Sequence, residues 1–231
     1  MIYRETDITR MRSIELFSHV SDAHFRKLLR AASLREFAPR AVLFREGQRP
    51  SVLYTLLEGS VELFSQHHDR RCTIAVLRGV KPCVLTSIMQ DRNPMSTRTL
   101  ERSRLLLVPA GLIHQMIETD AGFTAAASHE LAADCRDVTD AFKAERLASA
   151  IERLASWMLR ADAGAGGSGQ FVLPYDKRTL AAVLGMAPAN LSRNLAALAS
   201  VGLSVRGRRV SVNNRPALAA RSGLGLAPPA E

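Results

Sequence analysis

Cysteine is scarce in this sequence. Of its 231 residues only Cys72, Cys83 and Cys135 are cysteines, and no two of them form a CxxC pair. A disulfide framework and a zinc site made of cysteines alone both need closer clusters, so the spacing argues against either. Isolated thiols suit a reducing compartment, and we expect a cytoplasmic protein with no metal site.

Long apolar runs are also missing. No segment approaches the roughly 18 uncharged apolar residues of a membrane-spanning helix. The first residues, MIYRETDITRMR, are charged and do not resemble a leader. We therefore expect no membrane insertion. Hydrophobic residues still make up 47% of the chain, which is enough for one large globular core or two ordinary ones.

Sequence signatures of enzymes are absent as well. The HExxH, GxSxG and phosphate-loop patterns each bring a nucleophile, a base or a metal ion to one place, and none of them occurs. We therefore predict that the protein is not an enzyme.

Acidic residues are in the minority. The 31 lysines and arginines outnumber the 22 aspartates and glutamates, which gives a net charge of +9. Much of the excess lies between Pro174 and Arg215, where seven basic residues accompany Asp176 alone, a net charge of +6. A polyanionic partner would explain this charge, and so would a solvated basic surface. The motifs in this region distinguish between a polyanionic partner and a solvated surface.

The chain contains three zones. From about Leu34 to Pro109, turn residues separate the β-type runs AVLF, VLYTLL, SVELF, TIAVL and SRLLLVP, which predicts a small antiparallel barrel or sandwich. From Ala121 to about Leu159, apolar residues take helical spacing. The segment ADAGAGGSGQF, from Ala161, is typical of a flexible or turn-rich stretch, and beyond it we expect two short helices and one hairpin.

The long helical zone changes phase in its middle. Two apolar stripes share a 4-3-4 spacing but are separated by a step of five residues. The first stripe consists of Leu131, Cys135, Val138 and Phe142. The second stripe consists of Leu147, Ile151, Leu154 and Met158. A hinge near residues 144–149 that joins two helices explains the break. The first stripe is typical of a helix that pairs with its own copy, and packing on the barrel explains its spacing equally well.

A helix stops and another starts within the basic region. In GMAPANLSRNL, Gly185 can end the first helix because it tolerates positive φ, and Pro188 can open the second because its missing N–H costs nothing there. Leu180, Leu184 and Leu191 supply the apolar contacts that a helix-turn-helix requires. An ordinary helical hairpin with solvated arginines is the alternative.

The following segment, LSVRGRRVSV, favours the helix-turn-helix, because it predicts two strands that form a basic wing beside the second helix. Arg193 on that helix could hold guanine O6 and N7 with two hydrogen bonds. The residues that we expect to meet DNA are Arg193, Asn190, Ser192, Pro188, Ala189, Lys177, Arg178, Arg206, Arg208 and Arg209.

Together these motifs resemble the Crp/Fnr regulators, a family of bacterial dimeric transcription factors. The likeness lies in VLFREGQRPSVLYTLLEGSVELF, in AIERLASWML and in DKRTLAAVLGMAPANLSRNLAAL with its wing, and its details resemble the FtrB-like branch. The resemblance implies an α+β fold with an N-terminal cyclic-nucleotide-binding-like β-roll (a double-stranded β-helix), a long dimerisation helix and a C-terminal winged helix-turn-helix.

The resemblance also implies domain limits and partners. The domains would be a β-roll sensor at 1–120, a dimerisation helix and hinge at 121–148, a winged helix-turn-helix at 149–221 and a disordered tail at 222–231. The partners would be double-stranded DNA with a palindromic operator, a second copy bound through Leu131, Cys135, Val138 and Phe142, and RNA polymerase if the protein activates. The family usually has an acidic residue that helps to read cytosine where this chain has Ala189, so the family's usual operator is not expected.

The sensor departs further from the family. Members that bind cyclic AMP carry Gly-Glu and then Arg-Ser, whereas this chain has Leu85-Thr86 and Met95-Ser96. The ribose-binding Glu and the phosphate-binding Arg are both missing, unless a shift of register gives Arg98 the second role. We therefore expect a signal other than cyclic AMP: either a small hydrophobic effector of unknown identity in an apolar pocket, or no effector. That pocket would be lined by Leu85, Thr86, Met89, Met95, Ser96 and Val138.

No cofactor is predicted, and haem is left open because some relatives are haem-based gas sensors. The iron–sulfur cluster of the oxygen-sensing branch needs three cysteines near the N-terminus, and this chain has none before Cys72. The haem candidates are Cys83, His67, His68, His19 and His24. Their simpler interpretations are a hairpin turn for the His67-His68 pair, a core position for Cys83 and a surface position for His24. A haem-based or redox-sensing transcription factor and a non-specific nucleic-acid-binding protein remain alternatives.

Overall fold

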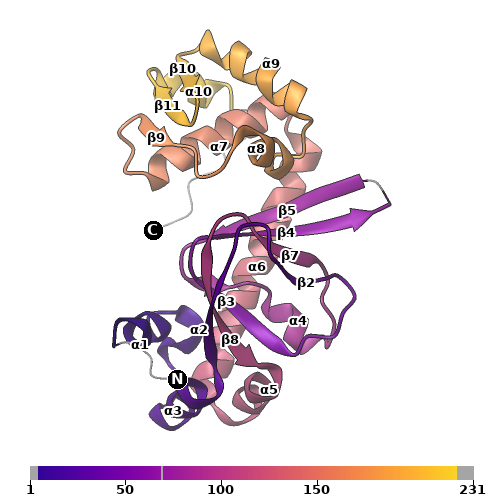
Figure 1. The fold of residues 1–231 in the computed structure, drawn as a ribbon. Coiled ribbons are helices and arrows are strands. Elements are labelled where there is room, and N and C mark those ends of the chain that lie inside the picture. The colour runs from indigo at the N-terminus through magenta and orange to yellow at the C-terminus, as the bar shows by residue number, and fades with distance from the viewer. Residues whose placement is uncertain (1–4, 69, 223–231) are drawn as a thin grey trace. The chain divides into compact units, whose positions relative to one another are not determined.

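The structure is a computed structural model that describes residues 5–68 and 70–222 (Figure 1). The chain divides into two compact units, Met1–Asp137 and Val138–Glu231, and the division lies inside helix α6. Within the described ranges, no helix is both long and apolar enough to cross a membrane. The same residues contain no group of three or more His, Cys, Asp or Glu side chains that could hold a metal ion.

Two four-stranded antiparallel sheets form the β-roll of the N-terminal unit. The first sheet has the order β1 (Ser33–Phe37), β8 (Ser103–Pro109), β3 (Val52–Glu58) and β6 (Lys81–Pro82). The second has the order β2 (Val42–Phe44), β7 (Ser96–Thr99), β4 (Ser60–His67) and β5 (Arg70–Arg78). Each of the five β-type runs in the sequence overlaps one of these strands, so the predicted antiparallel architecture is confirmed.

Apolar side chains from both sheets fill the interior of the roll. Val61 and Leu63 enter it from β4, and Leu105 and Leu107 enter it from β8. The two residues of each pair stand two positions apart because alternate side chains of a strand share one face. Tyr54 contacts the rings of its neighbours Phe37 and Phe44, with centroid distances of 6.3 and 5.7 Å.

Five helices and the start of α6 build a second core against β3 and β8. They are α1 (Glu5–Arg12), α2 (Glu15–Ser18), α3 (Asp22–Ala31), α4 (Leu85–Met89) and α5 (Ala110–Thr119), followed by α6 (Ala121–Leu147). Phe17 of α2 stacks on Phe123 of α6, and the ring centroids are 6.1 Å apart. The first turns of the long helix are therefore anchored in the N-terminal unit.

The predicted break between two long helices is confirmed. Helix α6 ends at Leu147, and α7 (Ala150–Gly164) begins after Ser149. Ser149 and Glu152 form a capping box, in which the Ser149 N–H donates to the Glu152 carboxylate at 2.7 Å and the Glu152 N–H donates to Ser149 Oγ. Within the second apolar stripe, Leu147 precedes the break and is 70% exposed, whereas Leu154 and Met158 beyond it are buried.

The C-terminal unit packs three further helices around a small sheet. The helices are α8 (Lys177–Val183), α9 (Pro188–Ala199) and α10 (Arg215–Ala220). The sheet has the order β10 (Leu203–Arg206), β11 (Arg209–Val212) and β9 (Gln170–Val172). Strands β10 and β11 form the predicted hairpin, and β9 is an addition that the sequence did not predict.

Strand β9 follows the glycine-rich segment that the sequence indicated to be flexible or turn-rich, and residues 165–169 form turns and bends. A buried carboxylate holds them, because Asp162 Oδ1 accepts a hydrogen bond from the Gly169 N–H at 2.8 Å and Asp162 Oδ2 pairs with Arg215. Gly169 has a φ of +76°, and an added Cβ would lie 2.9 Å from the Val212 carbonyl oxygen of β11. The predicted disordered tail begins at Ser222, and all but that residue lies outside the described part of the chain.

Candidate nucleic-acid interface

The turn between α8 and α9 has the local chemistry that the sequence indicated. Asp176 caps α8 by accepting a hydrogen bond from the Thr179 N–H at 2.7 Å, and this bond holds the pKa of Asp176 below its usual value. Gly185 lies in the turn with a φ of +63°, and Pro188 is the first residue of α9. The buried leucines of the two helices, with Leu191 on α9, join one apolar core. The predicted helix-turn-helix is therefore confirmed.

The outer face of α9 carries the residues that we expected to meet DNA. Pro188, Ala189, Asn190, Ser192 and Arg193 are all exposed. Asn190 Oδ1 accepts a hydrogen bond from Arg193 Nη2, so the amide orients the guanidinium along the helix surface. Ser192 Oγ donates to the Pro188 carbonyl oxygen at 3.2 Å. Arg193 is the only charged residue on this helix.

The wing presents its arginines in two different ways. Arg206 and Arg209 face each other across the β10–β11 hairpin, and both are exposed. Arg208 instead donates from Nε and Nη2 to the Leu173 carbonyl oxygen, at 2.9 and 2.7 Å. Two hydrogen bonds thus fix its guanidinium to the segment that precedes α8.

A groove of about 540 Å³ lies between the C-terminal half of α9 and the wing. Its basic members are Lys177 and Arg206, and Ala196 and Ala199 contribute methyl groups from α9. Arg178 is also exposed in the first turn of α8. Arg215, which belongs to the same basic stretch of sequence, is paired with Asp162 and so offers less charge to an external anion.

The residues expected to line an effector pocket have different surroundings. Leu85 is buried in the core that the helices form, whereas Met95 packs against the interior of the β-roll. Met89 is 48% exposed. Thr86 is half-buried on α4, and Ser96 Oγ accepts a hydrogen bond from the Glu46 N–H at 3.0 Å. Val138, which belongs to the C-terminal unit, is 63% exposed.

Arg98 has a partner that sequence reasoning missed. Glu62 is only 3% exposed, and its Oε2 accepts from Arg98 Nε and from Arg71 Nη2, each at 2.7 Å. Thr73 donates to the other carboxylate oxygen at 2.6 Å. Glu62 stands between Val61 and Leu63, which point into the roll, so the alternation of strand side chains places this ion-pair cluster on the outer face of the sheet.

The haem candidates occupy separate places. His67 and His68 lie at the exposed turn between β4 and β5, as predicted, and His19 is also exposed. Cys83 is buried in the interior of the roll, and burial raises the pKa of its thiol to about 12. A thiol that stays protonated at neutral pH is a poor metal ligand, because the thiolate is the ligating form.

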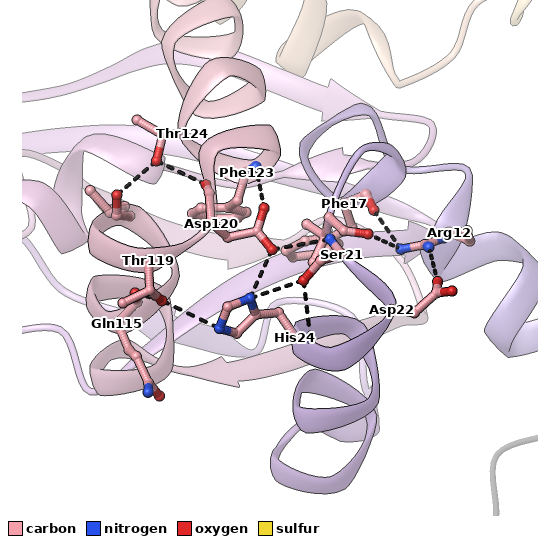
Figure 2. Close-up of polar contacts among 12 residues, drawn as sticks. Arg12, Phe17, Ser21, Asp22, His24, Gln115, Thr119, Asp120, Phe123 and Thr124 are labelled. Carbon is pink, nitrogen blue, oxygen red and sulfur yellow. Dashed lines mark hydrogen bonds and ion pairs between the residues drawn. The ribbon is translucent and has the colours of Figure 1, made fainter.

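His24 is not the surface residue that the sequence suggested. Its Nδ1 contacts Asp120 Oδ2 (Figure 2) at a distance of 2.8 Å, and its side chain is 17% exposed. Asp120 also accepts from the Ser21 N–H on Oδ2 and from the Phe123 N–H on Oδ1, each at 3.0 Å. Although the carboxyl is buried, these hydrogen bonds hold the pKa of Asp120 well below its usual value. The cluster joins α3 to the start of α6.

The first apolar stripe of α6 is largely open to solvent. Val138 and Phe142 are 63% and 60% exposed, and Cys135 is exposed as well. Leu131 differs, because it packs partly against the N-terminal core. Packing on the N-terminal core thus accounts for Leu131 alone among the four residues.

Two protein-family models match the chain. A cyclic nucleotide-binding domain matches residues 34–120, and a Crp-like helix-turn-helix domain matches residues 152–221. No curated protein sequence matches the chain significantly.

Solved structures show the same fold. FixK2 from Bradyrhizobium japonicum is 19% identical, with a TM-score of 0.74 over 84% of this chain and 98% of that one. CooA from Carboxydothermus hydrogenoformans, solved as a mutant, is 15% identical, with a TM-score of 0.72 over 85% of this chain and 90% of that one. The c-di-GMP responsive global regulator CLP from Xanthomonas campestris is 17% identical, with a TM-score of 0.69 over 83% of this chain and 99% of that one.

Proposed function

We propose that this chain acts as a homodimer on a palindromic operator. The premise is that it belongs to the Crp/Fnr family of DNA-binding transcription regulators. A signal in the β-roll other than cyclic AMP would control it. The observation that carries the proposal is the exposed Arg193, oriented by Asn190 on the outer face of α9 and accompanied by the basic wing. We place the protein in the cytoplasm and in the FtrB-like branch of the family.

The dimer would form through α6. The exposed residues Cys135, Val138 and Phe142 recur at near-heptad spacing, and a self-facing seam would bury them together with Leu131. The two recognition helices would then enter successive major grooves, about 34 Å apart, which is one turn of DNA. The functional regions would be the sensor at 1–120, the dimerisation helix and hinge at 121–148 and the DNA-binding domain at 149–221. RNA polymerase would be a partner if the regulator activates.

Three observations argue against cyclic AMP as the signal. Met95 supplies no cation for the phosphate, Thr86 supplies no carboxylate for the ribose, and Arg98 is already bound to Glu62. The effector site remains an apolar pocket near Leu85 and Met89 in our proposal, and the effector itself is unknown. Haem is the second candidate, and a Soret band in the freshly purified protein would establish it.

Replacing Arg193 tests the proposed role in DNA recognition. Arg193→Ala should lose preference for the operator, at a cost of about 1–3 kcal/mol per half-site, because a bidentate contact to guanine disappears. Weak binding to random DNA should persist. Gel-shift titrations with operator and random duplexes measure both affinities.

Arg30→Ala is the matched control, since it removes the same charge from an exposed position on α3 of the other unit. It should leave operator preference intact. An equal loss on operator and random DNA in Arg193→Ala would contradict the role of Arg193 in base recognition. A wild-type protein without preference for any sequence would support the alternative, a non-specific nucleic-acid-binding protein.

A further inference from the structure

One stripe of α9 stands directly opposite the buried leucines of that helix. Ala189, Arg193, Ala196 and Ser200, the last at the helix end, follow one another at steps of four, three and four residues, and all four are exposed. Leu191 and Leu198 are buried on the other side of the helix. The stripe thus contains one cation between two methyl groups.

We propose that this stripe recognises a half-site in which a guanine, bound by Arg193, is flanked by thymines whose C5-methyl groups pack against Ala189 and Ala196. The inference rests on the proposed function and specifies the operator that it requires. Thymine is distinguished in the major groove by its C5-methyl group, and an alanine methyl is a suitable apolar contact for it.

The other polar side chains near the stripe are already engaged. Asn190 Oδ1 accepts from Arg193, and a bidentate contact to adenine would need that oxygen. Ser192 Oγ donates to the Pro188 carbonyl oxygen, and Ser200 Oγ donates to the Ala197 carbonyl oxygen at 2.8 Å. Arg193 is therefore left as the main donor to base edges from this face of α9.

Helix geometry lets the three side chains reach different base pairs. Ala189 and Arg193 are about 6 Å apart along the helix axis, and Arg193 and Ala196 are about 4.5 Å apart, at 1.5 Å per residue. Successive base pairs rise about 3.4 Å. Each alanine is thus one to two base steps from the guanine, on opposite sides of it.

The same alanines disfavour other bases. A cytosine or an adenine at either position would bring its amino group against a methyl group that cannot accept a hydrogen bond. Such a group loses its water partner and gains none. Thymine has no amino group in the major groove, so its contact with an alanine methyl group costs the fewest hydrogen bonds to water.

Deoxyuridine tests this proposal because it differs from thymidine only by the missing methyl group. The preferred operator is first selected from a random duplex library with the full-length protein. We expect thymines on both sides of the guanine, and deoxyuridine at either position should weaken binding about fourfold per half-site, the value of one buried methyl group. Binding is measured by fluorescence anisotropy.

Two variants connect the effect to Ala189. Ala189→Gly should bind the thymine operator about as weakly as the wild type binds the deoxyuridine operator, with no further loss when deoxyuridine replaces that thymine. Ala189→Glu should shift the preference at that position towards cytosine, because a carboxylate accepts from cytosine N4. Ala219→Gly, at an exposed position on α10, controls for loss of helix stability.

The outcomes separate this inference from the proposed function. A selected operator without flanking thymines, or equal binding of thymidine and deoxyuridine operators, would overturn the methyl contacts and leave Arg193 as a reader of guanine. Failure to select any operator would count against the proposed function itself.

Discussion

Asp120 is a single carboxylate that links two chain segments, the start of α3 and the start of α6. It accepts hydrogen bonds from the N–H groups of Ser21 and Phe123 and lies 2.8 Å from the His24 ring (Figure 2). Next to it, Gly122 packs so closely on the His19 carbonyl that an added Cβ would clash. The start of α6 is thus held in position by the first turn of α3 and the residues just before it.

We predict that Asp120→Asn lowers the free energy of unfolding by about 2 kcal/mol at neutral pH, because hydrogen bonds to a charged group are lost. The pKa of Asp120 is depressed in the folded state, so its stabilisation is present above the unfolded value, about 4, and is lost as the pH falls further. The wild type should therefore lose stability more steeply than the variant below about pH 4. Urea unfolding across this pH range measures the difference.

Asp22→Asn is the matched control, since the Asp22 side chain is 79% exposed in its pair with Arg12. It should cost about 0–1 kcal/mol, the usual range for a surface ion pair. Parallel pH curves for the wild type and Asp120→Asn would show that the carboxylate charge contributes nothing.

Single residues were predictable where local chemistry fixes them. Gly185 and Pro188 have roles that follow from backbone conformation alone, and both predictions are confirmed. The contacts of Asp120 with His24 and of Glu62 with Arg98 join residues 96 and 36 positions apart. No periodicity or motif indicates such pairs, because only the folded sheets and helices bring them together.

At the scale of the elements, the wing combines two kinds of arginine. We predict that Arg206→Gln reduces the dependence of log Kd on log salt by about one per subunit, because an exposed arginine that contacts a phosphate releases about one counterion.

Arg208→Gln should instead cost about 1–2 kcal/mol of folding stability, because its hydrogen bonds to the Leu173 carbonyl are lost. Salt titrations of DNA binding and thermal unfolding measure the two effects.

The two variants serve as controls for each other. An unchanged salt slope in Arg206→Gln would show that Arg206 does not contact the DNA backbone. Full stability in Arg208→Gln would show that its hydrogen bonds do not hold the wing.

Many elements were visible in the sequence, and β9 shows why others were not. A three-residue strand is too short to show alternation, and glycines surround it. What makes it a strand is the ladder to β11 and the anchoring of the preceding loop by Asp162. Both depend on residues that are distant in the sequence.

At the scale of the whole molecule, the exposed stripe of α6 makes the assembly testable. We predict that Val138→Asp weakens the proposed dimer at least tenfold, since two like charges would meet across a self-facing seam and lose solvation. The monomer should fold normally, because Val138 is 63% exposed. Sedimentation velocity over a concentration series measures the association.

His129→Asp adds the same charge to an exposed position nine residues away, on the opposite side of α6. It should leave the dimer intact. A Val138→Asp protein that remains dimeric at low concentration would exclude this seam.

The response to cyclic nucleotides is the second property of the whole molecule. We predict that calorimetric titration with cyclic AMP or cyclic GMP shows no binding and that neither compound changes operator affinity. A phosphate near Arg98 would have to compete with Glu62, and burying an unpaired anion is costly. Micromolar binding that tightens operator binding, and that is lost in Arg98→Ala, would show instead that Arg98 is the phosphate ligand.

The anchored loop before β9 has a consequence for how this gene can vary. Every glycine codon begins with GG, so any change in its first or second base replaces the glycine. At Gly169 such a change would place a side chain on a residue with a φ of +76° and within 2.9 Å of the Val212 carbonyl. Only third-base changes are silent there. The codon for Gly169 therefore tolerates few base changes, although it lies in a segment rich in glycine.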